Sequence, residues 1–283
     1  MTERTKVTIP YLREKKAKKR PITMLTGYDF PFALIEDEAG IDMILCGDSL
    51  GNTVYGFYGT TQVTMELMIP HTAAVRRAAP NSFVVGDMPF MSYQPSDETA
   101  IRNAGRFLQE TGCDAVKLEG GEGMAERVRA ISRAGIPVQG HLGLTPQSVS
   151  ALGGFKARGR DAVEALKLIH DAQIIEEAGA FSIVLEAIPP EIGRIITERA
   201  QIPIIGIGAG PYTDGQVLVI HDILGLFTGR KAKFVKQYCD LNRQVREAVA
   251  AYKEDVEAGR YPAEEHCYSI DPAILKEIKK ELI

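Results

Sequence analysis

Four short apolar segments of this sequence each end in an acidic residue. They are Met43–Asp48, Phe83–Asp87, Ala115–Glu119 and Phe181–Glu186. An apolar run of this length is typical of a strand that is buried on both faces, as in a parallel sheet. The acid then lies where the strand leaves the core. Because the four acids occupy equivalent ends of buried strands, the pattern predicts that they share one site.

Strand and helix patterns alternate along most of the chain. The other predicted strands are Ile22–Thr26, Pro137–His141, Ile202–Ile207 and Val217–Ile220. Eight strands with intervening helices, in a chain of about 250 residues or more, predict a single-domain α/β fold, the (β/α)8 TIM barrel. We place the barrel at 22–235, a leading helix within 1–20 and a C-terminal helical extension at 240–283. The connection 208–216 is too short for a full crossover helix, so we expect an irregular barrel there.

Two connections after strand ends are candidate lids. Residues 50–63 are rich in glycine, which predicts a loop without a helix, and residues 142–159 contain four glycines. Long loops beyond the C-terminal ends of strands commonly carry binding segments. We therefore expect both loops to border the site.

Composition narrows the possible partners. The formal net charge of −4 argues against a general nucleic-acid binder, so the basic cluster Lys15–Arg20 is interpreted as part of a solvated leading helix rather than a nucleic-acid arm. No apolar stretch approaches the roughly 18 residues of a membrane span, and no apolar secretory core opens the chain, so we expect a cytoplasmic protein. The four cysteines are widely separated, which predicts reduced, mostly buried thiols rather than a zinc site or disulfides.

In a barrel of this kind, the C-terminal ends of the strands surround the site. This rule gathers six side chains at one mouth: Asp48, Asp87, Lys117, Glu119, His141 and Glu186. Several carboxylates with one histidine and no cysteine suit Mg²⁺ better than zinc. Such carboxylates repel one another unless a cation neutralises them. For any single acid, the alternative is a satisfied strand-end residue or a helix cap.

A cation in this position would favour the chemistry of α-keto acids. A metal with open coordination positions can chelate such an acid and acidify the carbon next to its carbonyl group, because it stabilises the enolate charge. Glu186, on the other side, could then remove the proton. Lys117 could neutralise the substrate carboxylate or the enolate oxygen.

Longer motifs surround these residues and resemble one known family. The motifs are Thr26–Asp29, Cys46–Ser49, Gly86–Phe90, Val116–Gly121, Gly140–Gln147, Val184–Pro189 and Ile204–Gly210. Through them, the chain from about Thr23 to Phe234 resembles the ketopantoate hydroxymethyltransferase (3-methyl-2-oxobutanoate hydroxymethyltransferase) family.

The resemblance implies a reaction of pantothenate and coenzyme A biosynthesis. A one-carbon unit would pass from 5,10-methylenetetrahydrofolate to 3-methyl-2-oxobutanoate through a Mg-stabilised enolate, giving 2-dehydropantoate. The resemblance also implies a homo-oligomer, a decamer of two stacked pentamers.

The resemblance assigns roles to residues that match the motifs. Asp48 and Asp87 would bind Mg²⁺ and thereby the substrate, with Glu119 as third ligand, direct or through water. Ser49 and Lys117 would hold the keto acid, and Glu186 would accept the proton. His141 belongs to the substrate site without a defined role.

Three other functions are weighed against this one. Gly206–Gly210 invites a dinucleotide interpretation, but it lacks the third glycine of the G-x-G-x-x-G spacing. A Mg²⁺-dependent carbon–carbon lyase or phosphomutase of the isocitrate lyase and phosphoenolpyruvate mutase group would share the enolate chemistry. Such lyases often carry a reactive cysteine in a mobile loop, and neither candidate lid contains one. The last alternative is a non-catalytic barrel that binds a keto acid or a metal.

Overall fold

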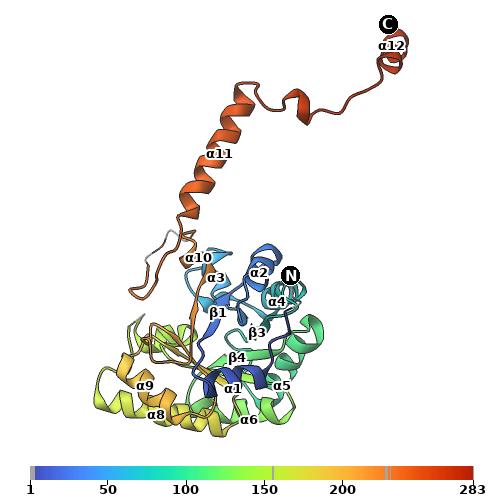
Figure 1. Ribbon diagram of the computed structural model, residues 1–283. Coiled ribbons are helices and arrows are strands. Elements are labelled where there is room, and N and C mark those ends of the chain that lie inside the picture. Colours follow the sequence, from blue (N-terminus) through green and yellow to red (C-terminus); the bar gives the residue numbers. More distant parts are fainter. Residues whose placement is uncertain (1–3, 155, 227–228, 230, 283) are drawn as a thin grey trace.

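The computed structural model describes residues 4–154, 156–226, 229 and 231–282. Eight parallel strands form a closed barrel in chain order (Figure 1). The strands are β1 Ile22–Thr26, β2 Met43–Cys46, β3 Phe83–Asp87, β4 Ala115–Glu119, β5 Val138–Gly143, β6 Ser182–Glu186, β7 Ile204–Ile207 and β8 Gly215–Leu218. The β1–β8 pairing closes the ring. The predicted (β/α)8 barrel is confirmed.

Helices surround the barrel and extend beyond it. The longer ones are α1 Ile9–Ala17, α2 Phe30–Glu38, α4 Met65–Ala78, α5 Asp97–Arg106, α6 Ala125–Arg133, α8 Ala162–Glu177, α9 Pro190–Arg199, α11 Leu241–Glu257 and α12 Pro272–Glu281. Shorter helical turns are α3 Leu50–Thr53, η1 Thr60–Gln62, η2 Phe107–Thr111, η3 Glu122–Met124, η4 Pro146–Ser148, α7 Val149–Leu152, α10 Ile220–Ile223 and η5 Glu264–His266. Some residues of the predicted segments lie outside the described residues: 1–3 in the leading segment, 155 in the second loop, 227–228 and 230 in the barrel, and 283 in the extension.

The last strand lies earlier than predicted. The described residues 208–214 form turns and no helix, as the short connection indicated, but β8 spans 215–218 rather than 217–220. Gly215 pairs with Ile22, and a Cβ on it would lie 2.4 Å from the Ile22 carbonyl oxygen. The backbone N–H of Ile220 donates to Thr26 Oγ1 at 3.0 Å, where α10 begins. This turn takes residues 220–222 out of the strand.

The first candidate lid is partly helical, contrary to the prediction. The glycine-rich segment 50–63 contains both α3 and η1. A Cβ on Gly51 would lie 2.7 Å from Val63 Cγ2. Glycine here therefore lets the short helix pack against its own loop rather than breaking it. The second candidate lid contains η4 and α7.

The N-terminal segment closes the opposite end of the barrel. Leu12 of α1 is fully buried and packs in the same apolar cluster as Met24, Phe83 and Val217. This cluster fills the end of the barrel where the strands begin.

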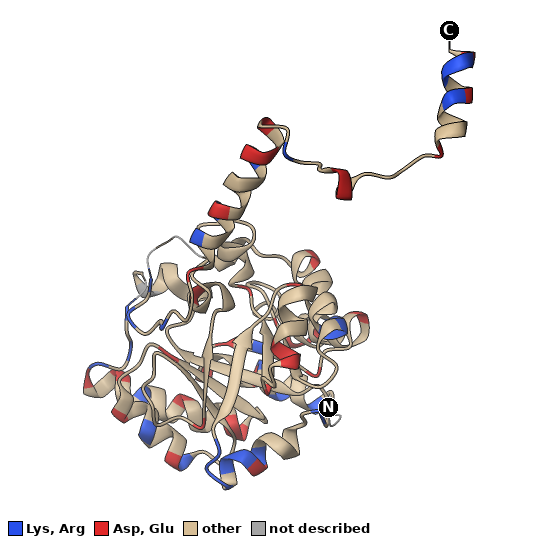
Figure 2. Cartoon of the chain, turned by 45° about the horizontal axis from the view of Figure 1, so that its top comes forward, with Lys and Arg blue, Asp and Glu red and all other residues tan. Residues whose placement is uncertain are grey.

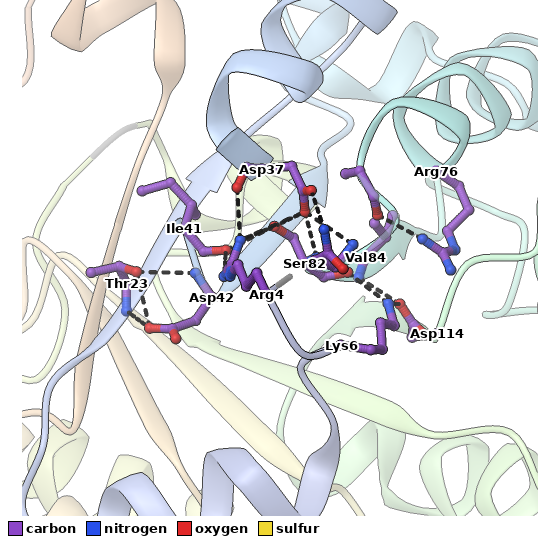
Figure 3. Close-up of polar contacts among 12 residues, drawn as sticks. Arg4, Lys6, Thr23, Asp37, Ile41, Asp42, Arg76, Ser82, Val84 and Asp114 are labelled. Carbon is purple, nitrogen blue, oxygen red and sulfur yellow. Dashed lines mark hydrogen bonds and ion pairs between the residues drawn. The ribbon is translucent and has the colours of Figure 1, made fainter. Parts of the chain in front are cut away.

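Ion pairs fasten this segment to the barrel (Figure 3). Arg4 donates to the Ile41 carbonyl oxygen at 2.6 Å, and Lys6 Nζ lies 2.6 Å from Asp114 Oδ2. Lys15 and Lys16 of α1 each pair at 2.6 Å with a barrel acid, Asp42 and Asp214 respectively. The prediction of a leading helix is correct, but the helix is not fully solvated. Two of its lysines pair with acids of the barrel, and Leu12 is buried.

The C-terminal helices project away from the barrel (Figure 1). Their exposed apolar residues in α11 are Val245, Val249, Tyr252 and Val256, and those in and just after α12 are Ile274, Leu275, Ile278 and Leu282. Charged residues of both signs are spread over the outer helices (Figure 2). Within the described residues, no helix combines the length and apolar character that crossing a membrane requires.

The cysteines are only partly as predicted. All four are free thiols, and Cys46 and Cys113 are buried. Cys239 is partly exposed and Cys267 is exposed, because both lie in the C-terminal part of the chain beyond the barrel. The expectation of mostly buried thiols therefore holds for the barrel and not for the part of the chain that follows it.

Candidate active site

Strand alternation directs the predicted site residues into the barrel mouth. Lys117 and Glu119 alternate with Val116 and Leu118, which pack outward in the apolar cluster beneath the helices. The strand register places Asp87 beside Lys117 and Glu119 beside His141. The positions of the strand ends and the register of strand pairing therefore bring these side chains together.

The acids and Lys117 form one buried cluster. Lys117 Nζ lies 2.8 Å from Asp87 Oδ1 and 3.8 Å from Glu119 Oε1. The other oxygen of Asp87 accepts a 3.0 Å hydrogen bond from the backbone N–H of Asp48. All four residues are at most 5% exposed. Asp48 lies two residues beyond the end of β2, so this hydrogen bond holds the turn that carries it.

The imidazole of His141 connects this cluster to Glu186. Its Nδ1 lies 3.2 Å from Glu119 Oε1, and its Nε2 lies 3.1 Å from Glu186 Oε2. Burial and the charge of Lys117 lower the pKa of His141, but the two carboxylates outweigh them and raise it to about 9. At neutral pH the ring is therefore an imidazolium between two acids.

Burial and mutual repulsion set the proton affinities of the other groups. Burial, followed by the charges of Asp87 and Glu119, raises the pKa of Asp48 well above its usual range. Burial also raises the pKa of Asp87. It acts in the same direction on Glu119, but His141 and Lys117 outweigh it, and the pKa of Glu119 is lowered. The three acids likewise overcome the effect of burial on Lys117 and raise its pKa. The positive charges of Lys117 and His141 are thus too few to stabilise all three carboxylates of the cluster in their ionised form.

Glu186 occupies the rim of the cluster. Its side chain is 16% exposed, compared with 2% for those of Asp87 and Glu119. The adjacent strand can come this close because Gly143 has φ +95°, and a Cβ there would lie 2.2 Å from the Glu186 carbonyl oxygen. Helix α9 begins after Pro189, and no described side chain caps its first turn. The alternative that Glu186 is a helix cap is therefore wrong.

Ser49 lies beside Asp48 at the start of α3. Its Oγ lies 2.8 Å from the hydroxyl group of Tyr28, which is fully buried. A Cβ on Gly47 would lie 2.8 Å from the same Oγ atom, so glycine at 47 leaves room for the serine. Ser49 is partly exposed and its hydroxyl is anchored on one side.

The sequence analysis assigned no role to two residues of the cluster. Gln147 donates from Nε2 to Asp48 Oδ2 at 2.8 Å, and the Tyr93 hydroxyl group donates to Gln147 Oε1 at 2.7 Å. Gln147 lies in a quoted motif, Gly140–Gln147, which was the available signal. Tyr93 had no comparable signal, because it follows the strand-end acid Asp87 by six residues within a loop.

The cluster fits a divalent cation with few protein ligands. Asp87 Oδ1 is buried. Among the described residues, it forms an ion pair with the ammonium group of Lys117. Within the same residues, no three His, Cys, Asp or Glu side chains are arranged around one point as ligands. Mg²⁺ commonly uses only one or two carboxylates and keeps several waters. Asp48 and Asp87 provide such a pair. Asp87 Oδ1 faces Lys117 but accepts no hydrogen bond from the described residues, whereas each oxygen of Glu119 has a hydrogen-bond partner.

Solved structures with similar barrels define the class of fold. Phosphonopyruvate hydrolase, crystallised with oxalate and Mg²⁺, superposes with a TM-score of 0.57 at 13% identity, covering 97% of this chain and 96% of that one. 2,3-Dimethylmalate lyase, a member of the PEP mutase/isocitrate lyase superfamily, gives a TM-score of 0.55 at 16% identity, with the same coverage of both chains. The chain thus has the barrel fold of that superfamily.

Sequence comparison identifies the family. The profile of the ketopantoate hydroxymethyltransferase family matches residues 6–264. The 3-methyl-2-oxobutanoate hydroxymethyltransferase of Syntrophomonas wolfei is 55% identical over 270 residues, which cover 95% of this chain and 98% of the relative. The enzyme of the same name from Moorella thermoacetica is 52% identical over 95% of this chain and 100% of its own length. The chain belongs to the ketopantoate hydroxymethyltransferase family, as the resemblance predicted.

Proposed function

We propose that this protein is an enzyme that transfers a hydroxymethyl group from 5,10-methylenetetrahydrofolate to 3-methyl-2-oxobutanoate, giving 2-dehydropantoate. The main support for this proposal is the position of His141, which has one ring nitrogen facing Glu119 and the other facing Glu186. A buried set of acids suited to a cation thus lies one ring away from a partly exposed carboxylate suited to moving a proton. The family membership supports the same reaction.

In this proposal, Asp48 and Asp87 hold Mg²⁺. Glu119 would take part through water, because Oε1 lies near His141 and Oε2 accepts from the backbone N–H of Gln147 at 3.0 Å. When bound, the cation supplies Lewis-acid polarisation of the keto group.

Residues of this chain perform the remaining steps. Lys117 and Ser49 hold the keto acid, and Glu186 accepts the proton from C3. C3 then forms a bond to the methylene carbon of the folate as one carbon–nitrogen bond of that methylene breaks, and a hydroxyl group from water replaces the second nitrogen. The two nitrogens take up the proton removed from C3 and one proton of the water, and tetrahydrofolate leaves. His141, as an imidazolium at neutral pH, balances charge on Glu119 and Glu186 and orients both.

The proposal extends to cellular context and assembly. Membership of a family of biosynthetic enzymes supports a cytoplasmic location for this protein. The chain serves as one barrel domain whose helices α11 and α12 contact neighbouring copies in a homo-oligomer, which we propose is a decamer. Its support is the exposed apolar stripe on α11 at Val245, Val249, Tyr252 and Val256.

The structural neighbours favour one competing function. The barrel resembles those of lyases and phosphonate-metabolising enzymes. A Mg²⁺-dependent carbon–carbon lyase or phosphomutase would use a similar site, although the relatives at 52–55% identity are named as hydroxymethyltransferases.

One assay separates these functions. The protein is incubated with Mg²⁺, 3-methyl-2-oxobutanoate and methylenetetrahydrofolate, and 2-dehydropantoate is sought by proton NMR. Parallel reactions contain isocitrate or phosphoenolpyruvate in place of the two substrates. Formation of 2-dehydropantoate alone supports the proposal. Cleavage of isocitrate or rearrangement of phosphoenolpyruvate supports the competing function, and a barrel that only binds ligands would do none of these.

A further inference from the structure

One glutamine contacts the ends of three strands at the proposed cation site. Gln147 belongs to η4, in the loop that follows β5, and is 4% exposed. Its Nε2 donates to Asp48 Oδ2 at 2.8 Å and to the Met88 carbonyl oxygen at 3.0 Å. Its backbone N–H donates to Glu119 Oε2 at 3.0 Å. The residue thus reaches Asp48 after β2, Met88 after β3 and Glu119 on β4.

The orientation of the side-chain amide is determined by its surroundings. The Tyr93 hydroxyl group accepts from the Glu119 backbone N–H at 3.1 Å and lies 2.7 Å from Gln147 Oε1. Of the two acceptors within reach of its proton, Gln147 Oε1 at 2.7 Å is nearer than the Glu119 carbonyl oxygen at 3.3 Å, and Nε2 faces Asp48 and Met88. The flipped amide would place an oxygen against two acceptors. Only one orientation satisfies every partner.

We propose that Gln147 is a positioning residue for the cation site. Its amide engages Asp48 Oδ2, so that Asp48 Oδ1 is the oxygen left for a cation. Its backbone N–H holds Glu119 Oε2, which fixes the carboxylate that would act through water. This inference rests on the proposed function, because Mg²⁺ on Asp48 and Asp87 belongs to it.

The same contacts couple the cation site to the loop 142–159. Turn η4 packs against η1 of the other candidate lid, so both lids meet beside Gln147. A cation that orders Asp48 therefore stabilises η4 through Gln147. By linkage, an ordered η4 increases the affinity of the site for the cation to the same extent.

Titration calorimetry with Mg²⁺ alone, on the full-length protein, tests the positioning role. Gln147→Met keeps an unbranched side chain of similar length but removes the donor. Partners of metal ligands typically contribute a factor of roughly 10–100 to metal affinity, so the dissociation constant should rise by that factor. Ser148→Ala is the matched control, since Ser148 is exposed on the same turn and should leave the affinity unchanged.

Hydrogen exchange provides a second measurement that does not depend on catalysis. Mg²⁺ should slow exchange of the backbone amides of residues 144–148 in the wild-type protein and in Ser148→Ala. In Gln147→Met the same peptide should exchange at one rate with and without Mg²⁺. A residue that only supported the fold would raise exchange in both conditions without removing the Mg²⁺ effect.

The outcomes distinguish this inference from the proposed function. If the wild-type protein does not bind Mg²⁺, the proposed metal role fails and the inference fails with it. If the wild type binds Mg²⁺ and folded Gln147→Met binds it equally well, the inference alone is overturned. Should Gln147→Met not fold, Tyr93→Phe removes the hydroxyl group that orients the amide. Weaker Mg²⁺ binding in Tyr93→Phe supports the inference, and unchanged binding overturns it.

Discussion

Nε2 of His141 lies 3.1 Å from Oε2 of Glu186, at the adjoining ends of β5 and β6. The other ring nitrogen faces Glu119, so the imidazole separates Glu186 from the acids of the proposed cation site. Glu186 is also the more exposed of the two carboxylates that flank the ring. In the proposed function, this arrangement would leave Glu186 close to a chelated substrate without making it a metal ligand. It is therefore the group that we expect to move the proton.

Replacing Glu186 with glutamine should separate proton abstraction from binding. The variant keeps the shape of the side chain but has no base. Exchange of the C3 proton of 3-methyl-2-oxobutanoate with deuterated solvent should fall roughly 10²–10⁴-fold, the usual contribution of a general base. Proton NMR of the isopropyl methine, with Mg²⁺ and without folate, follows this step alone.

Binding measurements on the same variant provide the control. Mg²⁺ and keto-acid affinities of Glu186→Gln should remain within about threefold of wild type, because Glu186 is a ligand of neither in the proposal. Normal exchange in a folded Glu186→Gln protein would transfer the role of base to another group. His141 is the next candidate, because the substitution removes one of the two carboxylates that raise its pKa.

Asp87→Asn should weaken Mg²⁺ and keto-acid binding together. The substitution removes a ligand charge and also the 2.8 Å partner of buried Lys117. Breaking a buried ion pair from one side typically costs roughly 3–5 kcal/mol, so the free energy of unfolding should fall as well. Calorimetry with each ligand and urea denaturation measure the two effects.

A surface ion pair provides the comparison for Asp87→Asn. Asp97 pairs with Arg127, and its side chain is 52% exposed. Asp97→Asn should cost no more than about 1 kcal/mol of stability and leave Mg²⁺ binding unchanged. Undiminished affinity for both ligands in folded Asp87→Asn would show that this carboxylate does not hold the cation.

Local patterns were sufficient to predict the barrel and six of the polar residues at its mouth. Lys117 and Glu119 were placed correctly because alternation along a strand and the common end of parallel strands are properties of short segments. The predicted ends of a strand were less accurate where contacts with a distant element determine them. The backbone of β8 begins at Gly215 because that glycine packs against Ile22, which lies almost two hundred residues earlier.

Loop-borne partners were beyond the reach of such patterns. Gln147 meets Asp48 across 99 residues of sequence, and Tyr93 meets Gln147 across 54. No period or strand end indicates these contacts, because they depend on the paths of two loops. The N-terminal lysines show the same limit. Lys15 and Lys16 were interpreted as solvated because their acidic partners become neighbours only when the barrel closes.

A charge in the apolar stripe of α11 should disrupt assembly. Val249 lies near the centre of the exposed stripe, and Val249→Asp would place a carboxylate in the proposed contact between copies. Sedimentation velocity at micromolar concentration should show a large homo-oligomer for the wild type and smaller species for the variant. Ala250→Asp adds the same charge on another face of the helix and should retain the wild-type size. A monomeric wild type would contradict the proposed assembly, and an unchanged Val249→Asp would exclude this stripe as a contact.

Glu36 of α2 should make the protein less stable as the pH rises. Both of its carboxyl oxygens are buried and accept no hydrogen bond from the described residues. Burial, with a smaller effect of Asp29, raises the pKa of Glu36 from 4.5 to about 8. Between these values the unfolded chain has lost the proton while the folded protein retains it.

The pH dependence follows from this difference in bound protons. Because Glu36 binds more protons in the folded state than in the unfolded state, its contribution to the free energy of unfolding decreases between pH 4.5 and about 8, by at most about 1.4 kcal/mol per unit. Glu36→Gln removes the ionising group, so its stability should fall less steeply over this window, and its stability relative to that of the wild type should increase toward pH 8. Urea denaturation from pH 5 to 8, at one protein concentration, measures both slopes. Glu38→Gln removes an exposed carboxylate from the same helix and should retain the wild-type slope. Equal slopes for Glu36→Gln and the wild type would mean that Glu36 ionises in the folded protein without the cost that its burial implies.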